Sequence, residues 1–138
     1  MLAGSAIRRV AIVGGQRIPF ARAHGAYAAV GNQDMLSAVL RTLVAKFNLA
    51  GVRLGDVIAG ATIKHSRDFN LVRECVLSSG LDPHTPGLDI QRACGTSLEA
   101  AILIGGKIAL GQIDAGIAGG VDSVSVTPIR PGSSSSNT

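Results

Sequence analysis

Two hydrophobic patterns alternate along this chain. Short, mainly apolar segments bounded by glycine, proline or polar residues predict buried β-strands. These segments are residues 10–13, 57–63, 88–93 and 115–121. Between them, apolar residues recur at helical spacing, and the predicted helices are residues 32–47, 70–78 and 98–110. This regular alternation of strand and helix predicts an open α/β fold with a mostly parallel sheet and right-handed crossovers.

The predicted helix boundaries come from residues that satisfy free backbone groups at helix ends. Asn32 and Asn70 stand where side-chain N-caps are expected. Thr96, followed three residues later by Glu99, predicts a capping box. Gly80 suits the left-handed turn that closes the second helix. These signals place the start of the third helix directly after a strand.

The third helix differs from the other two in its pattern. Residues 98–110 are apolar on nearly every side, which predicts a helix buried all round. Gly105 and Gly106 lie within it and lower helix stability relative to alanine. Their presence indicates that another backbone passes close to the helix at this point.

The length of 138 residues suits one domain. We expect an N-terminal extension at residues 1–8, a single partial domain at residues 9–129 and a low-complexity tail at residues 130–138. Within the tail, a proline, a glycine and a run of serines end the pattern of predicted elements.

Composition narrows the classes of function. Apolar residues make up 46% of the chain and aromatic residues only 3%, a mix that suits parallel strands covered by helices. The net charge of +4 comes from scattered Arg and Lys residues, so we expect no nucleic-acid partner. We expect no membrane span, because no apolar run is long enough. The two cysteines form no CxxC pair, so we expect no metal and a cytoplasmic location, or a mitochondrial or peroxisomal one in a eukaryote.

Cys94 is the strongest candidate for chemistry. It lies between predicted strand 88–93 and a predicted helix, and ligands of open α/β sheets bind outside the carboxyl ends of the strands. The helix dipole and the free N–H groups at a helix start favour a thiolate. The same N–H groups can stabilise an oxyanion on a bound acyl group. The pattern therefore indicates a nucleophile, while a small buried core residue stays open as the alternative.

The other cysteine and the histidines are weaker candidates. Cys75 lies among apolar residues of a short predicted helix and is expected to be a core residue. We expect solvated loop side chains at His24, His65 and His84, although His65 follows a strand and is the nearest to a site position. The pair Gly14-Gly15 lacks the spacing of a dinucleotide-binding turn.

Four segments resemble the thiolase family in order and spacing. Residues 91–100, Gln-Arg-Ala-Cys-Gly-Thr-Ser-Leu-Glu-Ala, resemble the active-site motif in which a cysteine opens a buried helix. The other three resemble the family's Arg-Thr-Pro-Phe signature, its Asn-x-Ala-Arg step and its Ala-Gly-Gly-x-Glu-x-Met-Ser run, and they are residues 17–20, 70–73 and 118–125. Any one motif is weak, but four in register are specific.

The sequence departs from the family pattern at a few positions. Asp122 stands where glutamate is usual, and Val124 stands where methionine is frequent. Gly95-Thr96 replaces the common Ser-Gly or Ala-Ser after the cysteine. These differences bear on substrate preference more than on fold. The motifs are closer to those of degradative thiolases and of the thiolase subunits of β-oxidation complexes.

The resemblance implies the incomplete first half of a layered α/β/α thiolase fold, with a final strand missing and Cys94 as the catalytic nucleophile. It implies transfer of an acyl group between a cysteine thioester and CoA, by thiolysis of a 3-oxoacyl-CoA or by condensation of acetyl-CoA. Acyl-CoA and CoA are then substrates, and no cofactor is permanently bound. A homo-oligomer, or a complex with a thiolase-type subunit, is expected. The family's base histidine, its second cysteine and its CoA-binding residues have no assigned counterpart in this chain.

Two other interpretations stay open. One is a catalytically inactive, truncated thiolase-like protein that acts only as an interaction partner, with exposed faces that a second half or a dimer would cover. The other is a different cysteine acyltransferase of similar fold, such as a condensing ketosynthase. The segments at residues 17–20 and 118–123 favour a thiolase over a ketosynthase.

Overall fold

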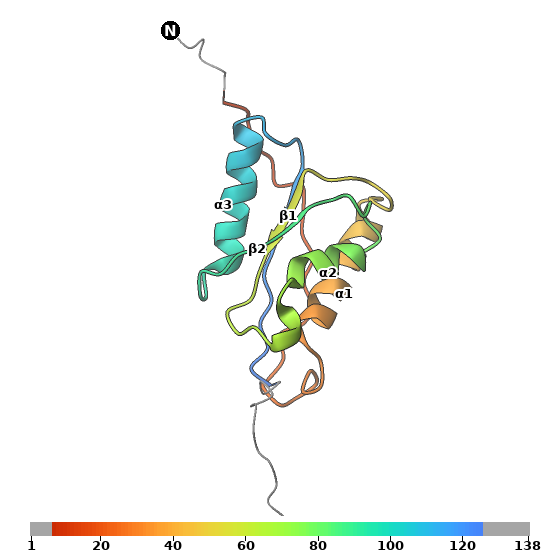
Figure 1. Cartoon of the computed structure of the whole chain (residues 1–138), viewed down its shortest axis with the longest axis vertical. Helices are drawn as coiled ribbons and strands as arrows, with labels where there is room; N and C mark the ends of the chain where they lie inside the picture. Colours follow the sequence, from red (N-terminus) through yellow and green to blue (C-terminus); the bar gives the residue numbers. More distant parts are fainter. Residues whose placement is uncertain (1–6, 126–138) are drawn as a thin grey trace, which may run out of the picture.

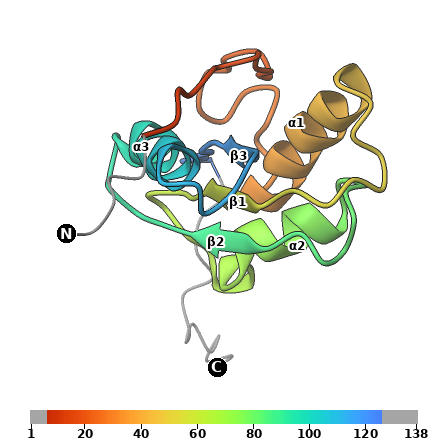
Figure 2. The same cartoon turned by 90° about the horizontal axis from the view of Figure 1, so that it is seen from above.

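The structure, a computed structural model, describes residues 7–125. Its elements in chain order are α1 (Asn32–Lys46), β1 (Asp56–Ala59), the short 3-10 helix η1 (Ser66–Asp68), α2 (Leu71–Leu77), β2 (Gly87–Asp89), α3 (Thr96–Ala109) and β3 (Gly116–Ala118). The three strands form a parallel sheet in the order β2-β1-β3. Helices α1 and α2 lie on one side of the sheet and α3 lies on the other (Figures 1 and 2). This arrangement confirms the predicted α/β/α layering and parallel sheet.

The central strand β1 divides the hydrophobic core into two parts. Successive side chains of a strand point to opposite faces. Val57 and Ala59 therefore belong to the cluster with α1 and α2, whereas Ile58 packs with Ala100 and Ile104 of α3. All three β1 side chains are at most 2% exposed. The predicted apolar stripe of α1 is confirmed, and its members in the first cluster are Leu36, Leu40 and Val44.

The first predicted helix cap is wrong by one residue. Gly31, not Asn32, is the N-cap of α1, and Asp34 Oδ2 accepts the Gly31 N–H at 3.1 Å. Asn32 is instead fully buried, and its side-chain amide donates to the Ile63 carbonyl (2.8 Å) and to Asp68 (3.0 Å). The Asn32 side chain therefore anchors the loop that follows β1 rather than the helix start.

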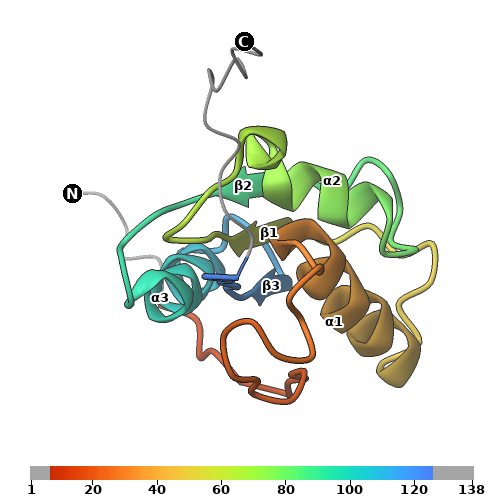
Figure 3. The same cartoon turned by 90° about the horizontal axis from the view of Figure 1, so that it is seen from below.

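The predicted strand at residues 10–13 is not formed. Ile12 is 95% exposed and Val13 is 82% exposed, and within residues 7–125 this segment joins no ladder. A strand needs the edge of a neighbour for its hydrogen bonds. Both edges of β1 are already taken, and the segment before α1 passes outside β3 without pairing with it (Figures 2 and 3). Its start is tied to α3, because the Arg8 N–H donates to the Ala109 carbonyl at 2.9 Å.

The three observed strands are shorter than the apolar segments that predicted them. β1 ends at Ala59, although the apolar run continues to residue 63. Beyond this point single backbone bonds replace the ladder: the Ile90 N–H donates to Ala59 O and the Val121 N–H donates to Gly60 O. The chain therefore leaves the sheet at its carboxyl edge, where it builds a site.

Helix α3 is buried on one side only, which corrects the prediction of a helix covered all round. Ala100 and Ile104 face the sheet, whereas Leu98 is 67% exposed and Ile102 is 59% exposed. The sheet covers α3 from one direction, and nothing in residues 7–125 covers its outer side. None of the helices in this part of the chain is long and apolar enough to cross a membrane.

The two helix glycines provide a test of this exposed surface. A Cβ placed on Gly105 or Gly106 meets no atom of the described residues within 4 Å, so the prediction that another backbone passes close to the helix here is wrong for this part of the chain. Replacing either glycine by alanine is therefore expected to raise the free energy of unfolding by about 0.5–1 kcal/mol, because alanine loses less backbone entropy in a helix. Urea titration followed by circular dichroism measures the change in the free energy of unfolding. As a control, Gly116→Ala should destabilise, since its Cβ would lie 2.7 Å from Ile104 Cδ1. A urea midpoint below that of the parent for both Gly105→Ala and Gly106→Ala would contradict the open surface of α3 at these two positions.

Candidate functional site

Cys94 lies in a tight turn between β2 and α3. The Gly95 N–H donates to the Arg92 carbonyl at 2.9 Å, and the Thr96 N–H donates to the Ala93 carbonyl at 3.2 Å. Thr96 Oγ1 braces the turn by accepting the Arg92 N–H and donating to Ala93 O, both at 2.8 Å. Cys94 itself is exposed. The predicted strand-to-helix position is confirmed, and the alternative of a buried core cysteine is excluded.

The predicted capping box at this helix start is wrong. Gly95 is the N-cap, and Thr96 is already the first residue of α3, so its hydroxyl bonds to the preceding turn rather than to the helix. Glu99 points to Arg92, with 3.1 Å between Oε2 and Nη1. The second predicted cap, Asn70, does precede α2, but its side chain makes no capping bond. Thr96 therefore shapes the turn that carries the cysteine.

The residue before the cysteine has a strained backbone. Ala93 has a φ of +44°, in the left-handed region that residues with a Cβ seldom adopt. Such a conformation costs on the order of 1 kcal/mol or more and persists only where surrounding contacts impose it. Here the Gly95 and Thr96 turn bonds impose it. The strain turns the chain sharply at the point where the Cys94 side chain leaves the backbone, a feature that an alanine does not signal in the sequence.

Cys94 lines a hollow of about 200 Å³ at the carboxyl edge of the sheet. The walls come from the segments that follow β1 and β3 and from the first turn of α3. The lining residues are Gly60, Ala93, Cys94, Thr96, Ser97, Gly120, Val121 and Asp122. Pockets that enclose whole drug-sized ligands start at roughly 300 Å³. This hollow therefore suits the reacting end of a ligand whose remainder lies outside.

Two glycines let the walls approach each other. A Cβ on Gly60 would lie 1.8 Å from the Ile90 carbonyl oxygen, so the backbone after β1 touches the backbone after β2. A Cβ on Gly120 would lie 3.1 Å from Ser97 Cβ and 3.4 Å from the Ser97 nitrogen. The glycine at residue 120 thus leaves the space beside the Ser97 N–H open.

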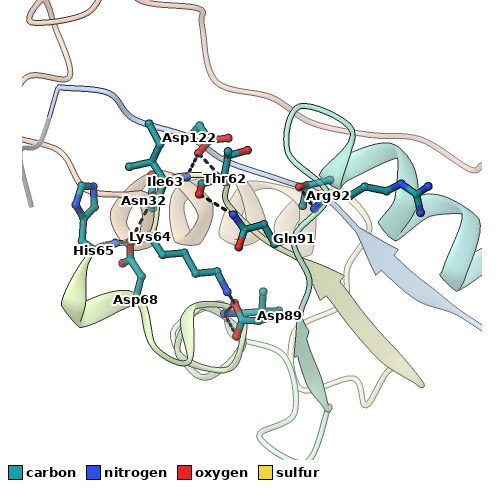
Figure 4. Close-up of polar contacts among 12 residues, drawn as sticks. Asn32, Thr62, Ile63, Lys64, His65, Asp68, Asp89, Gln91, Arg92 and Asp122 are labelled. Carbon is teal, nitrogen blue, oxygen red and sulfur yellow. Dashed lines mark hydrogen bonds and ion pairs between the residues drawn. The ribbon is translucent and has the colours of Figure 1, made fainter.

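A carboxylate ties the wall segments together (Figure 4). Asp122 Oδ1 accepts the N–H groups of both Thr62 and Ile63, each at 2.9 Å. From the other side, Gln91 Nε2 donates to the Thr62 carbonyl at 3.0 Å. The loop after β1 is therefore held by side chains from the ends of both neighbouring strands. Sequence reasoning noted Asp122 only as a departure from a motif, because its contacts join residues about 60 positions apart.

Comparison with known proteins decides the family. The sequence matches the family described as "Thiolase, N-terminal domain" over residues 10–138. This chain belongs to the thiolase family. The match covers nearly the whole chain, and the thiolase resemblance of the four sequence motifs is thereby confirmed.

Relatives and a solved structure place the chain within thiolases. It is 38% identical over 121 residues to the 3-ketoacyl-CoA thiolase of Shewanella sp. (strain ANA-3), covering 88% of this chain and 28% of that protein. The 3-ketoacyl-CoA thiolase of Pseudoalteromonas atlantica is 36% identical over 121 residues, which again cover 88% of this chain and 28% of that protein. The crystal structure of the Bacillus anthracis acetyl-CoA acetyltransferase matches with a TM-score of 0.70 and 26% identity, covering 83% of this chain and 27% of that one. The chain thus spans little more than a quarter of each of these thiolases.

The second cysteine of this thiolase chain is a core residue, as predicted. Cys75 is fully buried in α2, and its Sγ lies 3.6 Å from the Gln33 carbonyl oxygen. Burial is the main cause that raises the pKa of the Cys75 thiol from its ordinary value of 9.0 to about 11. Cys75 therefore stays protonated near neutral pH, and its side chain is buried, whereas the Cys94 side chain is exposed.

Two of the three histidines of the thiolase chain are exposed, as predicted. His24 has a φ of +57° and its N–H donates to Ser125 Oγ at 2.8 Å. The His84 N–H donates to Asp82 Oδ1 at 2.7 Å, and its ring Nδ1 lies 2.8 Å from the same oxygen. These backbone and ring contacts lower the pKa of Asp82.

His65 departs from the prediction of a solvated side chain. It is only 8% exposed, and both ring nitrogens are buried without a hydrogen-bond partner in residues 7–125. The loop folds inward because Asp68 Oδ2 accepts the His65 N–H at 3.1 Å and also an amide hydrogen of Asn32. None of the three histidines is among the described residues that line the Cys94 hollow.

Proposed function

We propose that this chain supplies the acyl-accepting cysteine of a thiolase-type acyltransferase, and that Cys94 is that residue. The observation that carries the proposal is an exposed cysteine in a walled hollow at the start of α3, in a chain of the thiolase family. The names of its relatives point to 3-ketoacyl-CoA and acetyl-CoA as the kinds of substrate.

The transfer step uses the Cys94 sulfur as nucleophile. The thiolate attacks the carbonyl carbon of an acyl-CoA, a new sulfur–carbon bond forms, and the bond to the CoA sulfur breaks. The proton lost by Cys94 leaves with CoA as its free thiol. With a 3-oxoacyl-CoA, attack occurs at the keto carbon and a carbon–carbon bond breaks, and the departing carbanion takes up the proton that Cys94 lost and leaves as acetyl-CoA. The thiol of CoA then takes the acyl group from Cys94, and its proton returns to the Cys94 sulfur.

The first turn of α3 supports this chemistry through a backbone donor. Gly95 and Thr96 use their N–H groups within the turn, so these two are not free for a ligand. The Ser97 N–H has no backbone acceptor within residues 7–125, and Ser97 lines the hollow. A free donor at a helix start stabilises negative charge on an acyl oxygen. We infer that Ser97 N–H takes part in the oxyanion site.

Sustained turnover needs groups that the described hollow does not provide. No histidine lines it among the described residues, and in thiolases the base is expected outside this chain. We therefore expect acyl transfer onto Cys94 without repeated turnover by residues 1–138 alone. The proposal also includes assembly, either as a homo-oligomer or as a complex with a thiolase-type subunit. CoA and acyl-CoA are the proposed ligands.

Mass spectrometry tests the proposal. The protein is incubated with acetyl-CoA and digested, and the acyl adduct is located. We expect the adduct on Cys94, its loss in Cys94→Ser, and its retention in the matched variant Cys75→Ser. An adduct on Cys75 only would overturn the assignment, as would no adduct on either cysteine in a version extended to the length of its relatives.

An interaction role is the second candidate. It is favoured by the exposed outer side of α3, where Leu98, Ile102 and Leu110 are each more than half exposed. Such exposed apolar surface is typical of association sites. The acyl adduct on Cys94 separates the two functions, because acylation of Cys94 excludes a purely structural role, whereas neither function predicts turnover by residues 1–138 alone.

A further inference from the structure

We propose that Asp122 is a specificity-determining residue of the Cys94 hollow, where its carboxylate disfavours acyl groups that carry a negative charge near the reacting carbon. This inference rests on the proposed function of Cys94. It concerns which acyl groups reach the thiol, not whether acyl transfer occurs.

The Asp122 side chain is held in place at the wall of the hollow. Its Oδ1 accepts two backbone N–H groups at 2.9 Å, from Thr62 and Ile63, so it cannot swing away without losing both bonds. The Val121 N–H donates to the Gly60 carbonyl at 3.0 Å and fixes the adjacent backbone. Asp122 is exposed, but these two bonds hold its carboxylate at one place on the wall of the hollow.

Asp122 is the charged residue in the described lining of the hollow. The remaining lining residues are glycine, alanine, valine, serine, threonine and the cysteine. The nearby charges are already matched: Arg92 pairs with Glu99 at 3.1 Å and Lys64 pairs with Asp89 at 3.5 Å. Within residues 7–125, Asp122 Oδ2 has no hydrogen-bond partner. The described residues that line the hollow therefore carry a net negative charge.

The size of the hollow brings this charge within range of the reaction. Asp122 and Cys94 line one space of about 200 Å³. Charges about 8 Å apart interact appreciably at low ionic strength and are screened at high salt. A neutral acyl group is unaffected by the carboxylate, whereas an acyl group with a second carboxylate meets a repulsion that grows as it enters.

Two alkylating reagents of similar size measure the charge directly at the sulfur. Iodoacetamide is neutral and iodoacetate is anionic, and with both the Cys94 sulfur displaces iodide while its proton goes to solvent. Their rates on Cys94 are followed by peptide mass spectrometry in low-salt buffer. In Asp122→Asn, which keeps the Oδ1 acceptor but removes the charge, we expect the iodoacetate-to-iodoacetamide rate ratio to rise about threefold to tenfold.

The matched control is Asp114→Asn, which removes the same charge from a side chain that is 92% exposed and paired with Arg8. This variant should leave the rate ratio within about twofold of the parent, because Asp114 is not among the residues that line the hollow and its charge is paired with Arg8. In the parent protein the ratio should also rise when salt is raised to about 1 M. That measurement tests the inference even if the Asp122→Asn variant does not fold.

The same comparison extends to acyl transfer with small thioesters of N-acetylcysteamine, which lack the phosphates of CoA. In the parent protein, a glutaryl group should be transferred to Cys94 more slowly than the neutral monomethyl ester of that group. Asp122→Asn should reduce the difference between these two rates. An unchanged reagent ratio in a folded Asp122→Asn variant, together with no salt effect in the parent, overturns the inference. If the iodoacetate-to-iodoacetamide ratio shifts but Cys94 gives no acyl adduct, the proposed acyl transfer is overturned. The inference of a negative charge in the lining of the hollow is then retained.

Discussion

Replacing Gly60 by alanine is expected to destabilise the chain by more than about 3 kcal/mol. The new Cβ would lie 1.8 Å from the Ile90 carbonyl oxygen and 3.1 Å from Thr96 Cγ2. The first contact is with backbone, which cannot move aside as a flexible side chain does. The Ile90 N–H also donates to the Ala59 carbonyl at 2.9 Å, so relief of the clash would break a bond between the ends of β1 and β2.

Urea unfolding followed by circular dichroism measures this effect. Gly15→Ala is the matched control, since a Cβ on Gly15 meets nothing within 4 Å, and it should change stability by no more than about 0.5 kcal/mol. Gly60 also lines the hollow. In any folded fraction of the Gly60→Ala variant, iodoacetamide should therefore alkylate Cys94 at an altered rate. A Gly60→Ala midpoint equal to that of the parent would show that the strands do not meet as described.

The two cysteines are expected to differ in reactivity by at least about 100-fold at neutral pH. Cys94 is exposed, whereas Cys75 is fully buried and has a pKa of about 11. At pH 8 only about one Cys75 thiol in 1,000 is ionised. Iodoacetamide labelling with peptide mass spectrometry should therefore modify Cys94 first, and Cys75 only after the chain opens.

The raised pKa of Cys75 also predicts how stability depends on pH. The folded state holds this proton more tightly than the unfolded state, so the contribution is fully present below about pH 9 and is lost as pH rises toward about 11. Cys75→Ala should reduce the fall in unfolding free energy across this window, which urea titrations at several pH values measure. Equal labelling of both cysteines in the folded protein would contradict the buried position of Cys75.

Much of this architecture follows from local sequence signals. The stripe of α1 has a helical period, and its members do pack against the sheet and α2. The step from β2 to α3 was placed correctly around Cys94 because a strand pattern, a glycine and a helix pattern meet there. Cys75 was placed in the core because its neighbours in the helix are apolar, and burial confirms it.

The errors share one physical origin, which is dependence on a distant neighbour. Residues 10–13 have the composition of a strand, but a strand exists only beside an edge that accepts its hydrogen bonds. Residues 98–110 have the composition of a covered helix, yet the sheet covers only one side of it. His65 lies in a polar loop, but the buried Asp68 and Asn32 draw that loop inward.

By itself, the sequence determined the α/β alternation, the family resemblance and the place of Cys94 between a strand and a helix, since periodicity and motif spacing are properties of neighbouring residues. Only the tertiary structure decided that Cys94 is exposed, that Gly60 and Gly120 let the walls meet, and that Asp122 clamps the loop after β1. These features join residues about 20 to 60 positions apart, and their geometry is set by packing of the sheet and helices.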